Sequence, residues 1–341
     1  MSPVRAVVAL VGAALAIGLV LLSAVHLLAP QRDGLLALSQ ILAPYLFLLL
    51  VPFLLLLRTP GLPGRLLRWS MAAAIVVFAA RFIPTWIPLP GSAPAAAATG
   101  PHVPVAAWNL ELGEPADQTV TDTIAGMDVA IMGLEELTPH HADAIARDPR
   151  LRDRFRTMVL HPTDGSLGIG LLSSLPAIGK PHITGDPPIL VQQLDAGKGR
   201  TVTVVVAHPL PGQITGVGDL IPLGYDSISR DRHLAQVRGI VDPILASGEP
   251  LLLIGDFNVV DREPAYADLA DGLIDSQRAV GLGPGHTWRP DRFKGFPFGL
   301  LRIDYLFAGN GVTPVSIGPD CTPRGSDHCI LAGTMALPGG S

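Results

Sequence analysis

Three long apolar stretches near the start of this 341-residue chain constrain its folding more than any other feature. They span residues 6–29, 35–57 and 69–89; Lys, Arg, Asp and Glu are absent from the first two, and Arg81 interrupts the third. About 20 apolar residues suffice for a helix to cross a bilayer, whereas a soluble helix needs a polar face. The stretches therefore predict three N-terminal transmembrane helices, the second kinked by Pro44 and Pro52.

The arginines beside these stretches predict the orientation in the membrane. Arg5 precedes the first stretch, Arg32 follows it, and Arg58, Arg65 and Arg68 lie between the second and the third. Because cytoplasmic loops carry the excess of Lys and Arg, we expect the N-terminus inside. Three spans then place the rest of the chain outside, as the extracytoplasmic domain of a multi-pass protein of the cell membrane. A cleaved signal peptide is the alternative for the first stretch, but its apolar run exceeds the usual ~7–15 residues.

A change of composition divides the chain into four parts. Residues 1–89 form the expected membrane domain, and residues 90–102 form a linker rich in Pro and Ala. Residues 103–336 form the expected folded domain, followed by a tail at residues 337–341. The linker carries no formal charge and cannot bury a core of its own.

Charge differs sharply between the two ends of the chain. Residues 1–98 contain six arginines and one acid, whereas residues 99–341 contain 18 bases and 28 acids. The acidic part is unlike a basic module that holds nucleic acid through bulk charge. Two cysteines, Cys321 and Cys329, are too few for a disulfide-dense scaffold or a four-cysteine zinc site. Outside the cytoplasm they could form a disulfide, and two free thiols are the alternative.

Short apolar segments with polar ends replace the long apolar stretches after residue 103. Alternation of strand and helix patterns predicts one mixed α/β (α+β) domain. The expected strands are residues 103–110, 129–134, 168–174, 201–208, 251–256, 301–308 and 329–335. The expected helices are residues 115–126, 139–147, 229–246 and 264–271.

Polar side chains gather at the ends of these strands. Asp256 and Asn258 are the clearest pair, because a strand period of two turns both to one face while Phe257 turns to the other. A carboxylate and an amide on one face make a plausible site element. The other strand ends carry Asn109, Glu135, Glu136, His208, Asp304, Asp327 and His328.

These segments together resemble the endonuclease/exonuclease/phosphatase superfamily, the DNase I-like metallohydrolases. The matching motifs, in order, are AAWNLE with Asn109, DVAIMGLEEL with Glu136, GIGLLSSLPAI, VVVAHP with His208, LLLIGDFN with Asp256 and Asn258, HTW, LRIDYLF with Asp304, and GSDHCIL with Asp327 and His328. The likeness covers essentially the whole folded domain. With three apolar spans ahead of it, the chain resembles the membrane-anchored bacterial branch, which includes proteins linked to teicoplanin resistance.

The resemblance implies a four-layered α/β sandwich and a role for each strand-end residue. It implies that Glu136 binds a divalent metal, Mg²⁺ or alternatively Mn²⁺, with Asn109 and Asp327 at the same end of the site. It implies that Asp256 aligns and deprotonates the attacking water, while Asn258 holds the phosphate or the water. It implies further that His208 and His328 bind phosphate oxygens, with Asp304 orienting a histidine. No organic cofactor is implied, and either one or two metal ions would fit the motifs.

One position departs from the family pattern. The family usually has Gln before the metal-binding Glu, and here that place is taken by Glu135. Alignment of the motif favours Glu136 as the ligand, and Glu135 is the alternative.

The expected activity is that of a membrane-anchored, metal-dependent hydrolase of phosphate esters or pyrophosphates. A lipid-linked phosphate or a phospholipid is the favoured substrate, because the anchor raises the local concentration of a bilayer substrate. An extracellular nuclease acting on DNA or RNA is the alternative, but an acidic domain repels polyanions. An inactive membrane receptor or scaffold would have lost the metal and phosphate ligands, which are all present here.

Overall fold

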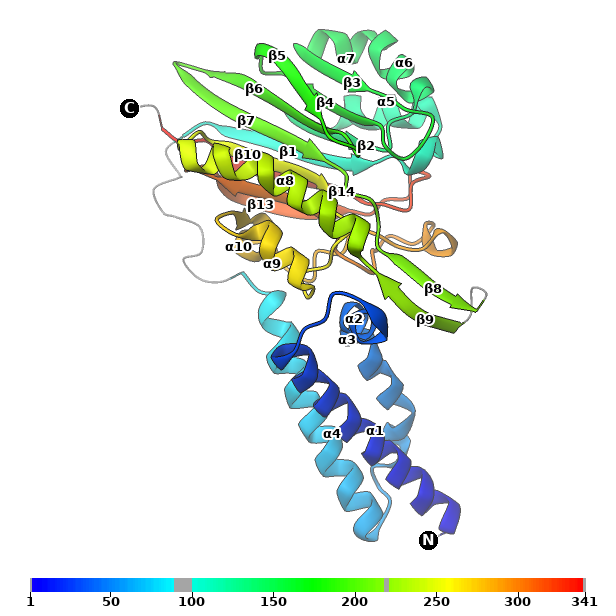
Figure 1. Cartoon of the computed structure of the whole chain (residues 1–341). Helices are drawn as coiled ribbons and strands as arrows, with labels where there is room; N and C mark the ends of the chain where they lie inside the picture. Colours follow the sequence, from blue (N-terminus) through cyan, green and yellow to red (C-terminus); the bar gives the residue numbers. More distant parts are fainter. Residues whose placement is uncertain (1, 89–99, 218–220, 340–341) are drawn as a thin grey trace. The chain divides into compact units, whose positions relative to one another are not determined.

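The computed structural model describes residues 2–88, 100–217 and 221–339, which form two compact units (Figure 1). We call them the membrane-helix unit and the sandwich unit. The membrane-helix unit consists of Met1–Trp86, Gln213–Ser227 and Arg262–Pro264. The sandwich unit consists of Ile87–Gly212, Ile228–Asp261 and Ala265–Ser341. Most of the predicted linker lies outside the described residues.

Two helices of the membrane-helix unit are long and apolar enough to cross a membrane. They are α1 (Pro3–Leu28), with a mean hydropathy of 2.7, and α4 (Gly61–Phe82), which continues through η2 (Ile83–Thr85) at 1.7. The predicted second span is instead a bent series, α2 (Gly34–Ile41), α3 (Ala43–Leu46) and η1 (Phe47–Leu56), with a bend of 82°. Pro44 explains the bend, because it has no N–H to continue the helical ladder. The unit therefore holds two candidate spans, or three if the bent pair counts as one.

Small residues let α1 and α4 approach each other closely. Ala9, Ala13 and Ala16 are buried on α1 against a cluster that includes Leu67 and Ala74 of α4. Close packing of small side chains is what holds helices together in lipid, where no hydrophobic driving force operates between them.

Segments from the middle of the sequence complete the membrane-helix unit. The hairpin β8 (Gln213–Val217) and β9 (Ile221–Asp226) belongs to it, and the Ser227 N–H just beyond donates to Asp33 Oδ1 at 2.9 Å. Arg262 Nη2 likewise donates to the carbonyl of Ile41 at 2.8 Å. Tertiary contacts thus join residues 213–227 and 262–264 to the apolar helices.

Two six-stranded mixed sheets form the sandwich unit. The first has the order β13-β14-β1-β2-β4-β3, and the second has the order β11-β12-β10-β7-β6-β5. The strands of the first sheet are β1 (His102–Asn109), β2 (Ile131–Glu135), β3 (Thr157–His161), β4 (Ile169–Ser173), β13 (Thr313–Asp320) and β14 (Ile330–Ala336). Those of the second are β5 (Ala177–Thr184), β6 (Ile189–Gly197), β7 (Arg200–Ala207), β10 (Leu251–Asp256), β11 (Ile274–Asp275) and β12 (Asp304–Gly309).

Three buried clusters define four layers, which confirms the predicted α/β sandwich. The central cluster lies between the sheets and joins Val105 of β1 to Ile254 of β10. A second cluster packs Trp108 and its neighbours under α5 (Asp117–Gly126), α6 (Pro139–Arg147) and α7 (Pro149–Arg154). A third packs the outer face of the other sheet, including Phe307, under α8 (Ile228–Ser247) and α9 (Pro264–Ala270). Because both faces of these sheets are covered, the central strands read as continuous apolar runs.

The seven expected strands and four expected helices are all present, with ends shifted by a few residues. The prediction missed β3, β5, β6, β8, β9, β11, β13, α7 and α10 (Ser276–Val280). Strand β5 illustrates the reason: it is an edge strand whose residues are mostly exposed, so it carries no apolar alternation.

Candidate active site

The strand ends that carry the predicted polar residues meet at one edge of the sandwich. Strands β1 and β2 run parallel in one sheet, as do β7 and β10 in the other, so their carboxyl ends coincide. Strand β12 is antiparallel to β10 and begins at that edge, with Asp304 directly opposite Asp256. Residues directly opposite on neighbouring strands share a face of the sheet. The two carboxylates are therefore neighbours.

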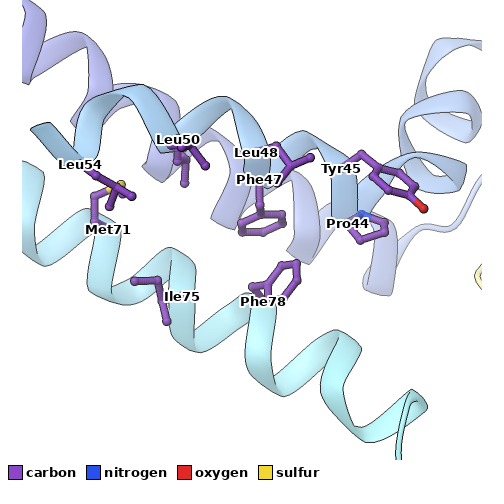
Figure 2. Close-up of a pocket in the computed structure, with 10 residues that line it drawn as sticks. Pro44, Tyr45, Phe47, Leu48, Leu50, Leu54, Met71, Ile75 and Phe78 are labelled. Atoms are coloured by element: carbon purple, nitrogen blue, oxygen red, sulfur yellow. The ribbon is translucent and has the colours of Figure 1, made fainter. Parts of the chain in front are cut away.

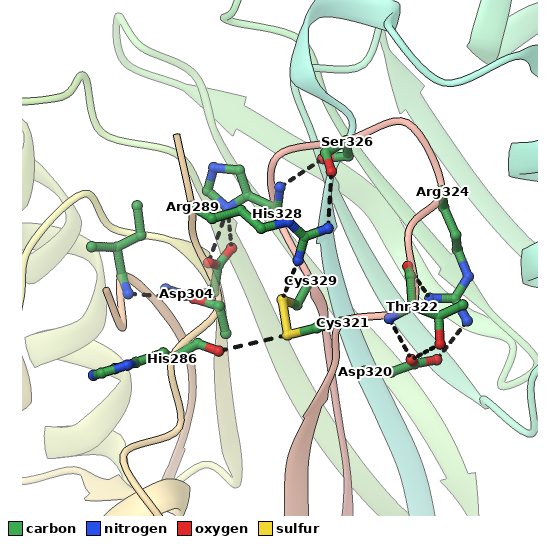
Figure 3. Close-up of a disulfide and its surroundings, with 12 residues drawn as sticks. His286, Arg289, Asp304, Asp320, Cys321, Thr322, Arg324, Ser326, His328 and Cys329 are labelled. Carbon is green, nitrogen blue, oxygen red and sulfur yellow. Dashed lines mark hydrogen bonds and ion pairs between the residues drawn. A yellow bond between two sulfur atoms is a disulfide. The ribbon is translucent and has the colours of Figure 1, made fainter. Parts of the chain in front are cut away.

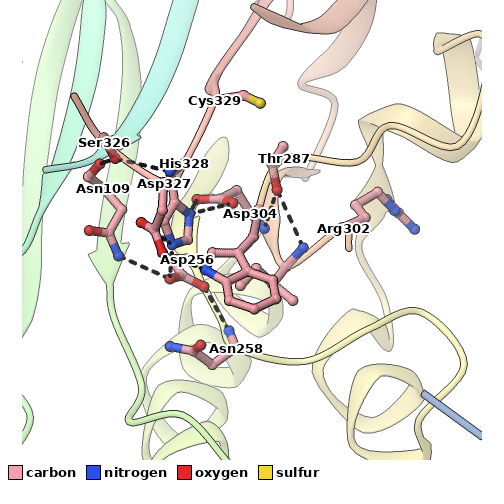
Figure 4. Close-up of polar contacts among 12 residues, drawn as sticks. Asn109, Asp256, Asn258, Thr287, Arg302, Asp304, Ser326, Asp327, His328 and Cys329 are labelled. Atoms are coloured by element: carbon pink, nitrogen blue, oxygen red, sulfur yellow. Dashed lines mark hydrogen bonds and ion pairs between the residues drawn. The ribbon is translucent and has the colours of Figure 1, made fainter. Parts of the chain in front are cut away.

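Asn109 connects carboxylates from the two sheets. Its Nδ2 donates to Glu136 Oε1 at 3.1 Å. The same Nδ2 donates to Asp256 Oδ2 at 3.1 Å (Figure 4). Its Oδ1 accepts the N–H of Glu111 at 2.9 Å, which fixes the amide orientation. Glu136 itself has a φ of 54° just beyond β2, a left-handed turn that ends the strand.

The motif of Asp256 and Asn258 forms a tight turn beside His208. Asp256 Oδ1 accepts the N–H of Asn258 at 2.9 Å, and Asn258 Nδ2 lies 3.2 Å from His208 Nε2. His208 Nδ1 lies 3.1 Å from the carbonyl of Ser166, so Nδ1 carries a hydrogen and Nε2 faces Asp256 Oδ2 at 3.5 Å. Gly255 precedes the turn with a φ of 143°, and a Cβ there would lie 2.1 Å from the carbonyl oxygen of Ala207. Glycine alone therefore fits between the strand ends.

His328 lies between Asp304 and Asp256 (Figure 4). Its Nδ1 is 3.0 Å from Asp304 Oδ2, and its Nε2 is 3.6 Å from Asp256 Oδ2. Burial lowers the pKa of His328, but the carboxylates of Asp304 and Asp256 outweigh it and raise that pKa well above 6.5. Burial, followed by the charge of Asp304, raises the pKa of Asp256 to about 6. The imidazole of His328 thus lies buried between the carboxyl groups of Asp304 and Asp256.

Asp327 is held by residues that the sequence did not predict as site residues. Its Oδ2 accepts the indole N–H of Trp288 at 2.7 Å, and its backbone N–H donates to Glu111 Oε2 at 2.7 Å. Lys294 Nζ lies 3.2 Å from Glu111 Oε1 and partly neutralises this carboxylate. Trp288 belongs to the HTW motif and Glu111 ends the AAWNLE motif, so both motifs held a signal for these positions.

Two hydroxyl groups hold the backbone around the site. Ser326 Oγ donates to the carbonyl of Asn109 at 2.7 Å and accepts the N–H of His328 at 3.0 Å. Thr287 Oγ1 lies 3.3 Å from the backbone nitrogen of Asp304 (Figure 4). Both were missed as functional positions, although each lies within a motif that the sequence analysis singled out.

A disulfide joins Cys321 to Cys329, which decides between the two alternatives that the sequence left open (Figure 3). It closes the loop that carries Ser326, Asp327 and His328. Buried Arg289 donates to Cys329 Sγ at 3.0 Å and to the carbonyl of Ser326 at 3.4 Å. The loop is thereby tied to the sandwich at its C-terminal end.

Glu135 and Glu136 occupy different environments. Glu135 is fully buried, and neither of its carboxyl oxygens has a hydrogen-bond partner among the described residues. Burial, with the charges of Asp304 and Asp256 nearby, raises the pKa of Glu135 well above 4.5. Glu136 is partly exposed and bonded to Asn109. Of the two carboxylates, Glu136 is the one presented to solvent at the strand edge.

The donor set suits a hard divalent cation. Glu136, Asn109, Asp256 and Asp327 offer carboxylate and amide oxygens, which Mg²⁺ prefers. Burial is the first cause of the raised pKa of Asp327, and the charge of Glu136 raises it further. Ligand atoms of Asp256, Asp304 and His328 also lie within 4.8 Å of one another. A cation beside Glu136 and Asp327 would relieve the repulsion between these two carboxylates, so the residues fit a metal of the Mg²⁺ class.

The Endonuclease/Exonuclease/phosphatase family matches residues 106–328, which contain every site residue described above. The chain belongs to this family. The match begins just after the start of β1 and ends at His328. Family members are generally hydrolases of phosphate esters. Comparison with functionally curated proteins finds no match.

Several solved structures share the fold of the sandwich unit. An endonuclease/exonuclease/phosphatase from Beutenbergia cavernae is 19% identical with a TM-score of 0.53, covering 70% of this chain and 72% of its own. TDP2 from D. rerio, complexed with a single-strand DNA product, is 16% identical with a TM-score of 0.52. The alignment covers 69% of this chain and 98% of the TDP2 chain. An endonuclease/exonuclease/phosphatase from Bacteroides vulgatus is 14% identical with a TM-score of 0.53. The alignment covers 70% of this chain and 99% of the Bacteroides chain.

Proposed function

We propose that this protein is a membrane-anchored, metal-dependent phosphoesterase whose catalytic domain lies outside the cytoplasmic membrane. The observation that carries the proposal is the convergence of three groups on Asp256 Oδ2. Asn109 Nδ2 lies at 3.1 Å, His208 Nε2 at 3.5 Å and His328 Nε2 at 3.6 Å from this oxygen. A carboxylate surrounded by an amide and two imidazoles is suited to hold a water molecule beside a phosphate.

The metal ion would be held by Glu136 and Asn109, with Asp327 at the same end of the site. When bound, a divalent cation neutralises charge on the phosphate oxygens and polarises the phosphorus–oxygen bonds. Glu136 suits this role because it is partly exposed and positioned by Asn109.

Asp256 is the base in the proposed reaction. Its pKa of about 6 leaves it ionised at neutral pH and makes it a stronger base than an exposed aspartate. It accepts a proton from the attacking water, while Asn258 orients the water or a phosphate oxygen. The hydrogen bond from the Asn258 N–H to Asp256 Oδ1 fixes the turn that joins these two residues.

His328 and His208 bind the phosphate oxygens. His328 is positively charged at neutral pH because of Asp304, so its Nε2–H can donate to a developing negative charge. The carboxylate of Asp304 orients the imidazole and stabilises its charge, as in other acid–histidine pairs. His208 is oriented by its bond to the carbonyl of Ser166.

The apolar helices support a substrate in the bilayer. Two or three segments are long and apolar enough to span a membrane, and a catalytic domain so anchored meets lipid-linked phosphates at a high local concentration. The disulfide Cys321–Cys329 supports the extracytoplasmic side, since disulfides persist in oxidising compartments. The acidic balance of residues 99–341 argues against DNA or RNA as the main substrate.

The test is hydrolysis by the full-length protein in detergent micelles with Mg²⁺. Phosphate or nucleotide release is measured on a prenyl pyrophosphate, a phospholipid, DNA and RNA, with Asp256→Asn as the inactive control. We expect release from a lipid substrate, abolished by EDTA and by Asp256→Asn. Release from DNA or RNA alone would favour the nuclease, and no release from any substrate would favour the receptor or scaffold.

The orientation is tested separately by reporters fused to the C-terminus. Alkaline phosphatase, which needs an oxidising compartment, is expected to be active there. A fusion active only in the cytoplasm would contradict the proposed topology.

A further inference from the structure

A buried arginine reaches the turn that carries Asn258. Arg230 lies in the first turn of α8 and is 1% exposed. A cation in this place is costly for two reasons: burial removes its hydration water, and the N-terminal turn of a helix favours negative rather than positive charge. Buried charges are found paired or hydrogen-bonded, so the partners of Arg230 indicate its role.

The guanidinium of Arg230 joins a carboxylate to the backbone of the candidate site. Its Nε and Nη2 donate to Asp231 Oδ1 at 3.0 and 2.9 Å, which fixes the plane of the guanidinium. Its Nη1 donates to the carbonyl oxygen of Asn258 at 3.1 Å. Asn258 stands two positions after Asp256, the last residue of β10. Arg230 therefore holds the backbone just where the strand gives way to the turn of the site.

The backbone of Asn258 needs such support because it has a left-handed conformation. Its φ is 52°, a region that residues with a side chain seldom occupy, although asparagine tolerates it better than most. Asp256 Oδ1 accepts the N–H of Asn258 (Figure 4), and Arg230 donates to its carbonyl. Both polar groups of the Asn258 backbone are thus held, and the direction of its side chain follows from this conformation.

The fixed backbone orients the Asn258 amide. Its Nδ2 donates to the carbonyl of Pro209 at 2.9 Å and lies 3.2 Å from His208 Nε2, so both amide hydrogens have partners. The other end of the amide, Oδ1, is an acceptor, and the side chain is partly exposed. Two acceptors, Asn258 Oδ1 and the Asp256 carboxylate, are therefore offered at this turn.

We propose that Arg230 is a positioning residue that orients the Asn258 amide toward the attacking water. The inference rests on the proposed function and deepens it, because it adds to the site a residue outside the motifs of the family. The water donates one hydrogen to Asp256 and the other to Asn258 Oδ1, which leaves a lone pair free for phosphorus. Without the bond from Arg230, the left-handed backbone of Asn258 loses a constraint and the amide loses this direction.

The asparagine side-chain signals test the inference without requiring turnover. Asn109, Asn258 and Asn310 are the asparagines of the chain, so labelling the full-length protein with ¹⁵N-asparagine gives a simple NMR spectrum in detergent. Arg230→Met removes the donors while filling most of the buried space. We expect this variant to shift the side-chain signals of Asn258, to speed exchange of its backbone N–H, and to leave Asn310 unchanged.

Turnover tests whether the Asn258 amide mediates the effect. Arg230→Met is expected to lower kcat by about 10–100-fold with little change in KM, as displacement of a positioned group does. In the Asn258→Gly background, glycine keeps the left-handed turn and lacks the amide, so adding Arg230→Met should cost less than about 2-fold. An arginine that merely stabilised the fold would lower kcat equally in both backgrounds.

Two variants control for general effects of substitution. Arg238→Met removes an arginine of the same helix that donates to the carbonyls of Leu269 and Asp271 at 3.1 and 2.8 Å. Phe78→Ala loosens the membrane-helix unit, where the Phe78 ring lies 5.5 Å from that of Phe47 and both line an apolar cavity (Figure 2). Neither variant should change the asparagine signals of the site or kcat.

Circular dichroism confirms folding, and Arg230→Lys replaces Arg230→Met if the latter does not fold, because lysine keeps the buried charge but lacks the planar fork. Unchanged Asn258 signals, or an equal loss of kcat in the Asn258→Gly background, would overturn the inference. Shifted signals without hydrolysis of any phosphate ester by the wild-type protein would leave Arg230 as the residue that orients Asn258 and contradict the proposed function. Hydrolysis by the wild-type protein with unchanged Asn258 signals in the variant would do the reverse.

Discussion

The Nδ1 atom of His328 lies 3.0 Å from Oδ2 of Asp304 in the interior of the sandwich unit. Both side chains are buried, so water screens their attraction only weakly. The pair places a positively charged imidazole at the sheet edge where strand β10 ends with Asp256. Removing the Asp304 carboxylate should therefore lower catalysis more than it lowers the stability of the fold.

Asp304→Asn is expected to reduce kcat by about 100-fold or more, in the range by which positioned acids and bases accelerate reactions. The amide cannot stabilise the imidazolium, so the pKa of His328 should fall in the same variant. Turnover with Mg²⁺ and a histidine NMR titration measure the two effects. Asp320→Asn, which removes a carboxylate bonded to Arg324 on β13, is the control. An unchanged kcat in Asp304→Asn would refute the orienting role.

Glu136→Gln is expected to weaken binding of Mn²⁺, used as a spectroscopic substitute for Mg²⁺, by about 10–100-fold. The reason is that Glu136 is presented at the strand edge beside Asn109. Electron paramagnetic resonance of the full-length protein measures free Mn²⁺ directly, without reference to activity. Glu135→Gln is the matched control, because its carboxyl is buried without a described partner. Stronger loss of binding in Glu135→Gln would assign the ligand role to Glu135 instead.

Stability is expected to fall with pH below neutrality partly because of His141. This side chain is fully buried on α6, and its Nε2 lies 2.8 Å from the carbonyl of Pro115. Burial is the main cause that lowers the pKa of His141 below 6.5. The unfolded chain therefore takes up a proton at a higher pH than the folded chain, so stability is lost as pH falls from 6.5 through the folded pKa.

His141→Gln should make this loss smaller while keeping a donor near Pro115. Thermal unfolding at pH 7.5 and pH 5.5 in the same detergent gives the difference in midpoint for each protein. Exposed His161→Gln controls for the loss of a histidine as such. Equal pH sensitivity of wild type and His141→Gln would show that another group is responsible.

The disulfide Cys321–Cys329 is expected to protect both cysteines from alkylation until a reductant is added. Intact mass then shows no modified thiol before reduction and two modified thiols after it. Reduction should also lower turnover, because the bond closes the loop that carries Asp327 and His328. Cys321→Ala tests the same link by mutation, and full activity of this variant would show that Arg289 and the backbone bonds suffice to hold the loop.

The local sequence pattern determined the apolar helices, the central strands and most of the candidate site residues of this protein. Continuous apolar runs predict α1 and α4, because any helix of such composition must bury all its faces in lipid or protein. Buried strands read as apolar segments whose ends carry the polar residues, so the motifs around Asn109, Asp256 and His328 were visible without coordinates. The family resemblance carried by those motifs is confirmed by the match over residues 106–328.

Only the tertiary structure decided which side chains from distant parts of the chain meet. It presents Glu136 at the strand edge and buries Glu135, since neighbouring residues at a strand end point in different directions. It brings Glu111 and Trp288 to Asp327 through contacts between residues far apart in the chain. It also joins residues 213–227 and Arg262 to the apolar helices. Periodicity reports what one segment buries, whereas the partner of each side chain depends on how distant segments pack.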